Sequence, residues 1–229
     1  MYSKNTIKIF IIIFLLAIIT YVCIYHGICK KSLSNSKKSL SNSRYIFIDG
    51  GAHKGETIYE FERSNLYSKH RWEIFSFEAN PYLISYIPKK KNVTVLNKAM
   101  WIDNKGLDFY FGVSTLAGNV VENKQTDTTK KSIKVDSVDF GQWLKENFKQ
   151  EDIIFVKLDI EGAEYPILDK MLKDESIEYV DKLYVEFHSS IMDDITEAKD
   201  KELVDAIKKL GILVAVKLMD SGNGKYFDE

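Results

Sequence analysis

Three polar residues in the second half of the chain could do chemistry: Asp159, Glu161 and His188. Asp159 ends the apolar run IIFVKLD, and Glu161 follows it in the sequence DIEGAE. Two carboxylates this close repel each other, so their placement predicts a neighbouring cation: a positively charged ligand, a bound divalent metal or Lys157. His188 could accept a proton, although an ordinary core or surface histidine fits the sequence equally well. Glu164 is explained by the preference for acids in a first helical turn.

A glycine-rich segment, DGGAHKG, follows an earlier apolar run at residues 49–55. Glycine allows φ > 0 and close approach of a ligand, so Gly51 would let the backbone come near one. Gly55 would open a helix whose N–H groups favour negative charge. The spacing does not match the G-x-G-x-x-G of nicotinamide-binding proteins. It matches D-x-G-x-x-x-G, with which methyltransferases hold S-adenosylmethionine; the alternative is an ordinary glycine-rich turn.

Glu78 ends the next apolar run, in the sequence FSFEANP. Its two carboxylate oxygens could accept hydrogen bonds from both hydroxyls of a ribose. Alternatively, Glu78 or Asn80 merely caps a helix that begins at Pro81. Because Glu78 lies one strand after the glycine-rich turn, the combination predicts a ribose site.

The elements that must position these residues alternate between short apolar runs and amphipathic segments. The apolar runs carry few polar positions, as expected for strands covered on both faces of a sheet. The predicted strands are 45–49, 74–78, 93–99, 153–159, 182–186 and 213–217. The predicted helices are 55–65, 81–87, 141–147, 163–173 and 196–210. This βα rhythm predicts a doubly wound, mostly parallel sheet of the α/β class, in which ligands bind at the carboxyl ends of the strands. Residues 107–113 predict an extra, antiparallel strand, and residues 114–131 a mobile loop.

The composition sets limits on function. The chain has 229 residues, 45% of them hydrophobic, which suffices for one catalytic domain and its core. With 32 basic and 33 acidic side chains, no net field draws it to nucleic acid. Both cysteines, Cys23 and Cys29, precede the domain, so a cysteine-held zinc site is excluded there.

The N-terminal segments do not belong to the predicted domain. Residues 1–8 form a short tail, and residues 9–29 an apolar stretch that can span a hydrocarbon core of roughly 30 Å as an uncleaved anchor. Residues 30–43, KKSLSNSKKSLSNS, repeat one heptad and predict a flexible, solvated stalk. We therefore expect a single-pass membrane protein with a domain at 44–229, and the lysines after the anchor slightly favour a cytosolic domain.

The motifs together resemble those of the FkbM-type methyltransferases. The resemblance covers residues 45–217 and is carried by FIDGGAHKGET, FEANP, NKAMW, VDSVDFGQWL, KLDIEGAEYPIL and EFH, in that order. It implies a Rossmann-like (class I methyltransferase) fold, S-adenosylmethionine as cofactor and O-methylation of a sugar or other hydroxylated small molecule. The cofactor-binding residues it implies are Asp49, Gly50, Gly51, His53, Gly55, Thr57, Glu78, Ala99, Met100 and Asp159.

The resemblance also places Asp159, Glu161 and His188 beside the transferred methyl group. His188 would take the proton of the acceptor hydroxyl, or a divalent metal on Asp159 and Glu161 would lower the pKa of that hydroxyl. Family members usually continue into a seventh strand, whereas this chain stops at GNGKYFDE. Two alternatives remain open: a membrane-anchored nucleotide-sugar glycosyltransferase, because Asp159 and Glu161 mimic a metal-binding D-x-D, and a non-catalytic module that keeps the fold.

Overall fold

A computed structural model describes residues 43–112, 118–120, 128–217 and 226–227. The chain divides into a unit at Met1–Ser43 and a second unit at Arg44–Glu229, which contains nearly all of the described residues. The expected tail and anchor, and all but the last residue of the expected stalk, lie outside the described residues. Within the described ranges, no helix has the length and apolar character needed to cross a membrane.

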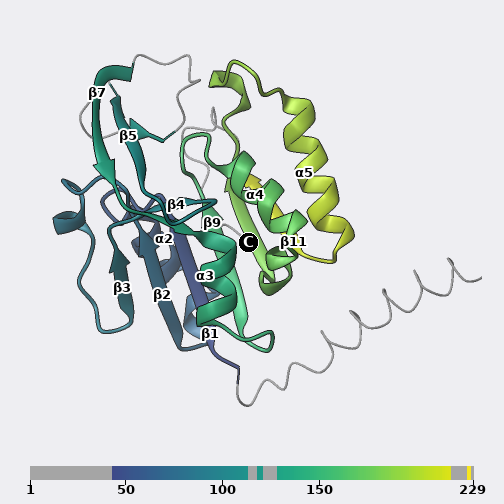
Figure 1. Cartoon of the computed structure of the whole chain (residues 1–229). Coiled ribbons are helices and arrows are strands. Elements are labelled where there is room, and N and C mark those ends of the chain that lie inside the picture. Colours follow the sequence, from purple (N-terminus) through teal and green to yellow (C-terminus); the bar gives the residue numbers. More distant parts are fainter. Residues whose placement is uncertain (1–42, 113–117, 121–127, 218–225, 228–229) are drawn as a thin grey trace, which may run out of the picture. The chain divides into compact units, whose positions relative to one another are not determined.

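A six-stranded parallel sheet forms the centre of the second unit (Figure 1). Its strands are β1 (Tyr45–Gly50), β2 (Trp72–Phe77), β3 (Val93–Leu96), β9 (Ile153–Leu158), β10 (Lys182–Glu186) and β11 (Leu213–Lys217). The spatial order is β11-β10-β9-β1-β2-β3, and every neighbouring pair is parallel. The strand order therefore reverses between β1 and β9, where an open α/β sheet binds its ligand. The prediction of an α/β fold with a mostly parallel sheet is confirmed.

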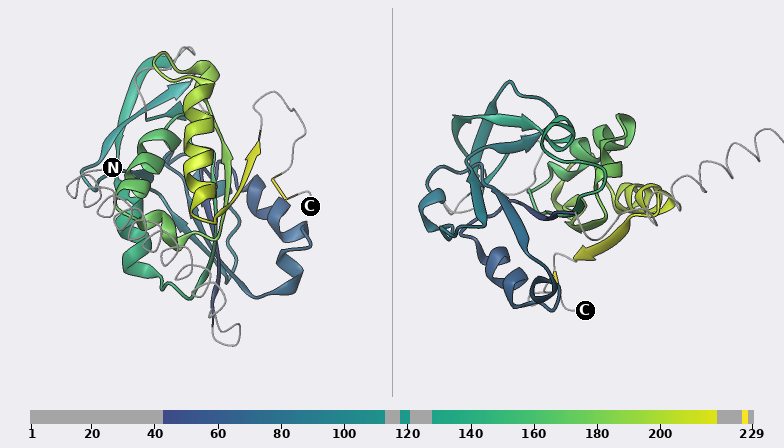
Figure 2. Two further views of the ribbon diagram at one scale, coloured as in Figure 1. Left: turned by 90° about the vertical axis from the view of Figure 1, so that its right-hand side faces the viewer. Right: turned by 90° about the horizontal axis from the view of Figure 1, so that it is seen from below.

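Helices cover both faces of this sheet (Figure 2). The helices are α2 (Glu56–Arg63), α3 (Phe140–Asn147), α4 (Glu164–Lys173) and α5 (Glu197–Lys209). The side chains of successive residues in β1 point to opposite faces of the sheet, as strand geometry requires. Ile46 and Ile48 join the core beneath α3, α4 and α5, and Phe47 joins the core beneath α2.

Two small sheets lie beside the central one. Strand β4 (Ala99–Trp101) pairs with β8 (Ser137–Asp139), and β5 (Leu107–Gly112) pairs antiparallel with β6 (Gly118–Asn119) and β7 (Thr128–Val135). The antiparallel strand predicted at 107–113 is confirmed. The strand predicted at 93–99 is instead two strands in different sheets. Of the loop predicted at 114–131, residues 118–119 form β6 and residues 128–131 begin β7, while residues 114–117 and 121–127 lie outside the described part of the chain.

The helix predicted at 81–87 is wrong. This segment forms turns and one short 3₁₀-helix, Ile84–Tyr86. Pro88 disfavours the helical conformation in the preceding residue, and so short a segment gains too few hydrogen bonds to offset helix nucleation. Similar 3₁₀ turns occur at Tyr67–Lys69, Ser176–Tyr179 and Ser189–Ile191.

Candidate functional site

A cavity of about 400 Å³ lies at the carboxyl edge of the sheet, at the ends of β1, β2 and β9. Of the twelve site residues proposed from the sequence, eight line it: Gly51, His53, Thr57, Glu78, Ala99, Met100, Asp159 and Glu161. Four others do not line it within the described part of the chain: Asp49, Gly50, Gly55 and His188. Lys157, the candidate cation, lines it as well. The cavity volume falls within the range of small-molecule sites, and its walls combine apolar side chains with a few carboxylates, as such sites do.

The glycine-rich turn is shaped by packing within the protein. Gly51 and Gly55 have φ of +77° and +86°, which side-chain-bearing residues rarely adopt. A Cβ at Gly51 would overlap the backbone carbonyl oxygen of Asp159, and one at Gly55 would overlap Pro88. The backbone N–H groups of Gly51 and Ala52 donate to the Phe77 carbonyl. The close approach that requires glycine at position 51 is therefore to β9, while the turn's other side lines the cavity.

Glu78 is fixed by two backbone hydrogen bonds. Its Oε2 accepts from the His53 N–H and its Oε1 from the Asn80 N–H, each at 2.7 Å. The side chain is buried, and burial raises the pKa of Glu78. Each oxygen keeps a second lone pair, and the residue lines the cavity. The carboxylate is thus preorganised to accept two further hydrogen bonds.

A buried lysine, Lys157, lies under the turn. Its Nζ is 3.4 Å from Asp49 Oδ1 and 3.6 Å from Asp159 Oδ2, and it donates to the carbonyls of Gly50 and Gly51. Burial alone would lower the pKa of Lys157, but the charges of Asp159 and Asp49 raise it above its ordinary value. Lys157 is therefore the cation next to Asp159, one of the three partners that the sequence left open.

Asp49 is fully buried at the end of β1. Burial raises its pKa, and the charge of Lys157 opposes that shift. Neither carboxylate oxygen has a hydrogen-bond partner among the described residues. Asp159 behaves differently: burial would raise its pKa, but Lys157 and then His188 hold it below its usual value. The shifts therefore favour the ionised form of Asp159, which lines the cavity, and disfavour the ionised form of Asp49, which is buried beneath the turn.

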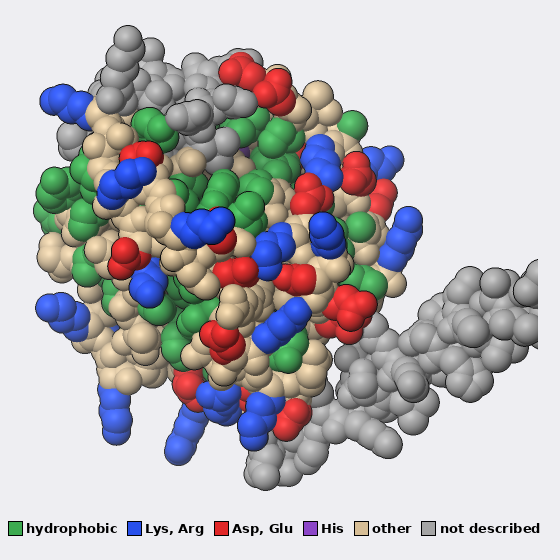
Figure 3. Space-filling model, viewed as in Figure 1, with side chains coloured by type: hydrophobic (Ala, Val, Ile, Leu, Met, Phe, Trp, Pro, Cys, Tyr) green, Lys and Arg blue, Asp and Glu red, His purple; other side chains and the backbone are tan. Residues whose placement is uncertain are grey.

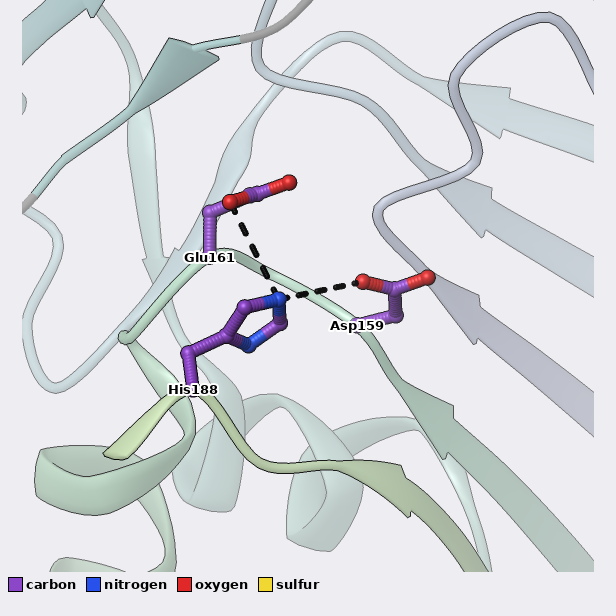
Figure 4. Close-up of side chains that lie close together, drawn as sticks. All are labelled: Asp159, Glu161 and His188. Atoms are coloured by element: carbon purple, nitrogen blue, oxygen red, sulfur yellow. Dashed lines mark ion pairs between the residues drawn. The ribbon is translucent and has the colours of Figure 1, made fainter. Parts of the chain in front are cut away.

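Asp159, Glu161 and His188 converge from two strand ends (Figure 4). His188 Nε2 is 3.8 Å from both Asp159 Oδ1 and Glu161 Oε2, and one atom from each residue lies within 4.8 Å of the others. His188 Nδ1 contacts Glu164 Oε1 at 3.1 Å. Burial would lower the pKa of His188, but the hydrogen bond with Glu164 and the nearby charges raise it to about 9.

Glu164 begins α4, as its acidic side chain predicts, and it also holds the preceding loop and His188 in place. Its side chain is fully buried, Oε1 accepts from the Ile160 N–H, and Oε2 accepts from the Gly162 N–H. Glu164 therefore shapes the DIEG loop and fixes the His188 ring from its Nδ1 side. Its spacing from Glu161 was visible in the sequence, but its contact with His188 depends on the strand order.

Among the residues of the cavity wall that the sequence interpretation missed are three with polar side chains: Glu60, Lys217 and Tyr226. The Tyr226 hydroxyl lies 2.9 Å from Asp159 Oδ2. No motif marks these residues, since they are brought together only by the fold of the chain's two halves.

A family model described as the methyltransferase FkbM domain matches residues 49–211. The match begins at Asp49, the last residue but one of β1, and extends past α5. It contains every site residue singled out from the sequence, but neither Lys217 nor Tyr226. No curated protein and no solved structure gives a significant match.

Proposed function

Since this chain belongs to the FkbM methyltransferase family, we propose that it is an S-adenosylmethionine-dependent methyltransferase whose cofactor lies in the cavity at the carboxyl edge. The observation that carries this proposal is Glu78. A buried carboxylate, fixed by two backbone N–H groups and facing a cavity, suits a pair of ribose hydroxyls. It also lies one strand from the point where the sheet order reverses.

The walls of the cavity fit the rest of the cofactor. Ala99 and Met100 line it with apolar surface near Glu78 and would lie against the adenine. His53 and Thr57 line it at the turn and the first helical turn of α2. When bound, S-adenosylmethionine supplies a methyl group already activated by a positively charged sulfur. The protein's work is then largely alignment, which can contribute up to about 7–11 kcal/mol to lowering a barrier.

We take the acceptor to be a hydroxyl of a saccharide or another small molecule, which must lose a proton. His188 could accept it only after losing its own proton, because its pKa lies at about 9, or a divalent metal held by Asp159, Glu161 and His188 could lower the pKa of the acceptor hydroxyl. The geometry favours the metal route. A histidine whose Nδ1 is held by Glu164 presents Nε2 to Asp159 and Glu161, which is the arrangement of a metal-binding histidine oriented by a carboxylate.

Measurements of metal binding and of turnover distinguish the histidine route from the metal route. The metal route predicts that Mn²⁺ binds the full chain and that His188→Ala weakens binding at least about 10-fold, measured by electron paramagnetic resonance. Once an acceptor has been found, a chelator should abolish turnover. Turnover that survives the chelator but not His188→Ala would leave the histidine as the proton acceptor.

We also propose that residues 9–29 anchor the protein in a membrane as a single pass, with residues 30–43 as a stalk and a cytosolic domain. The support is the uncharged apolar run and the lysines that follow it. Extraction of membranes at high pH tests the anchor, and protease accessibility tests the side. We expect no nucleic-acid partner, a proposal supported by the interspersed basic and acidic side chains on the face drawn in Figure 3.

Calorimetry with the purified full chain tests the proposed activity at its first step. S-adenosylmethionine should bind, and Glu78→Ala should weaken binding by about 1.5–3 kcal/mol because charge-assisted hydrogen bonds are lost. Glu73→Ala, in the same strand but at its opposite end, is the matched control and should bind as the wild type does. Binding of a nucleotide-sugar such as UDP-glucose instead would favour a glycosyltransferase. Cofactor binding without methylation of any hydroxyl compound would favour a non-catalytic module.

A further inference from the structure

The end of the chain returns to the cavity through two residues, Tyr226 and Phe227. Phe227 is buried, and its ring centroid lies 5.0 Å from that of Phe61 and 4.8 Å from that of Tyr184. The backbone N–H groups of Tyr226 and Phe227 both donate to Glu60 Oε1 in α2. The dipeptide is thus held by core packing on one side and by a helix carboxylate on the other.

Tyr226 contacts the charged groups at the ends of three strands. Its hydroxyl lies 2.9 Å from Asp159 Oδ2 and 3.0 Å from Glu186 Oε2, so two carboxylates share one hydroxyl hydrogen. The Nζ of Lys217 lies 4.7 Å from its ring centroid and that of Lys157 lies 5.6 Å away. A phenol among two ammonium groups and two carboxylates has its ring face and its hydroxyl both occupied by charge contacts.

This part of the cavity wall and Glu78 lie on different sides of the glycine-rich turn in the order of the sheet. Tyr226, Lys217 and Asp159 belong to the β9–β11 side of the sheet, and Glu78 belongs to the β2 side, with the turn after β1 between them. A ligand with its ribose at Glu78 therefore extends past the turn toward Tyr226. The wall there carries both signs of charge: the carboxylates of Glu60 and Asp159, and the ammonium of Lys217. A zwitterionic group needs both.

We propose that Tyr226 positions the amino-acid end of the cofactor, by walling the cavity beside Lys217 and by holding the carboxylate of Asp159. This proposal rests on the proposed function, and deepens it with a residue outside the matched family domain. The phenol ring of Tyr226 lines the cavity, and its hydroxyl donates a hydrogen bond to one particular oxygen of Asp159. Oδ2 faces Tyr226 and Lys157, so Oδ1 is left toward His188.

A pair of ligands tests the proposal without an acceptor. S-adenosylmethionine has the amino-acid end, whereas 5′-methylthioadenosine shares its adenosine but lacks both that end and the positive charge on sulfur. S-adenosylhomocysteine, which has the amino-acid end and an uncharged sulfur, separates these two differences and should lose affinity in variants of Tyr226 as S-adenosylmethionine does. In calorimetry with the full chain, Tyr226→Ala should weaken S-adenosylmethionine at least about 10-fold and change 5′-methylthioadenosine less than about threefold. Tyr226→Phe keeps the ring and loses only the hydroxyl, so its loss for S-adenosylmethionine should be smaller and again absent for the truncated ligand.

Tyr45→Phe is the matched control, because Tyr45 begins β1 at the opposite end of the strand from the cavity. It should bind both ligands as the wild type does, and melting temperatures of all variants report the fold. Equal losses for both ligands in a folded Tyr226→Ala protein, or no loss for either, would overturn the positioning role. In that case Glu78→Ala still weakens both ligands, so the proposed function survives. A wild-type chain that binds neither ligand would overturn both proposals.

Discussion

The charges at the two edges of the sheet are organised differently. At the amino edge, Arg44 precedes β1 and Asp152 precedes β9. The Arg44 guanidinium donates from Nη2 to Oδ2 of Asp152 at 2.7 Å and from Nε to Oδ1 at 3.3 Å, and the Lys149 N–H donates to Oδ2. The hydrogen bond with Asp152 raises the pKa of Arg44. Each partner stabilises the other's charge.

At the carboxyl edge, the charges are close but incompletely paired. Both oxygens of Asp49 lack a hydrogen-bond partner among the described residues, and His188 Nε2 is 3.8 Å from each of two carboxylates. Asp49 does not line the cavity and has Lys157 as its ion-pair partner, so its missing hydrogen bonds are a cost in stability, whereas Asp159, Glu161 and His188 are spaced so that they could hold an ion. The charges at the amino edge are thus fully paired and contribute to stability, whereas the carboxyl edge keeps charged side chains beside a cavity, at some expense in stability, as the proposed binding site requires.

The largest expected effect is at Gly51, where the carboxyl edge must be rigid. Gly51→Ala combines a left-handed φ with overlap of the Asp159 carbonyl, so we expect the free energy of unfolding to fall by about 2–5 kcal/mol. Gly211→Ala is the matched control, because Gly211 has φ of +80° but nothing within 4 Å of its Cβ position. It should lose only about 1–2 kcal/mol in urea unfolding. Equal losses in the two variants would show that the turn is not tightly packed against β9.

The next largest effect is expected at the amino edge, where a substitution should lower stability without changing affinity for the cofactor. Asp152→Ala removes the acceptor of several hydrogen bonds and leaves Arg44 without its partner, so the free energy of unfolding should fall by about 2–4 kcal/mol. In the folded fraction, affinity for S-adenosylmethionine should be unchanged, because the amino edge is a full strand length from the cavity. A large change in affinity with unaltered stability would break the comparison.

A smaller effect is expected in acid. Burial would raise the pKa of Asp152, but the hydrogen bonds from Arg44 and Lys149 hold it below its ordinary 3.8. The contribution of this carboxylate to stability is therefore complete above about pH 4 and is lost as the pH falls through its lower folded-state value. Urea unfolding between pH 5 and 2, read against Asp152→Asn, measures it. The variant should show a shallower loss of stability in this range, and parallel curves would contradict the assignment.

Much of the fold was predictable because short segments of the sequence, such as apolar runs and glycine-rich turns, indicate their own secondary structure. The strands that became β1, β2, β9, β10 and β11 are apolar runs, and the start of α2 after Gly55 follows from a glycine turn. The helix predicted at 81–87 failed for a local reason, the proline at position 88 and the short length of the segment. The other failure depended on a distant partner. The segment at 93–99 splits because Ala99 pairs with Ser137, and nothing nearby in the sequence announces that partner.

The site was predictable to the same degree. Glu78 and Asp159 end strands whose carboxyl ends meet at one edge, so their proximity followed from the fold class. Lys157 was one of three candidate cations for Asp159, but its contact with Asp49 was not predicted, because it depends on the register of β9 against β1. Tyr226 carried no signal at all, because its place at Asp159 depends on where the end of the chain docks.

The most direct test of the account compares one residue from each edge by two measurements on the full chain. For Glu78→Ala and Asp152→Ala, we would measure the affinity for S-adenosylmethionine by calorimetry and the free energy of unfolding in urea. The account predicts an affinity loss of about 10- to 150-fold for Glu78→Ala alone, and the larger loss of stability for Asp152→Ala. Undiminished affinity in Glu78→Ala, or no binding by the wild type, would contradict it.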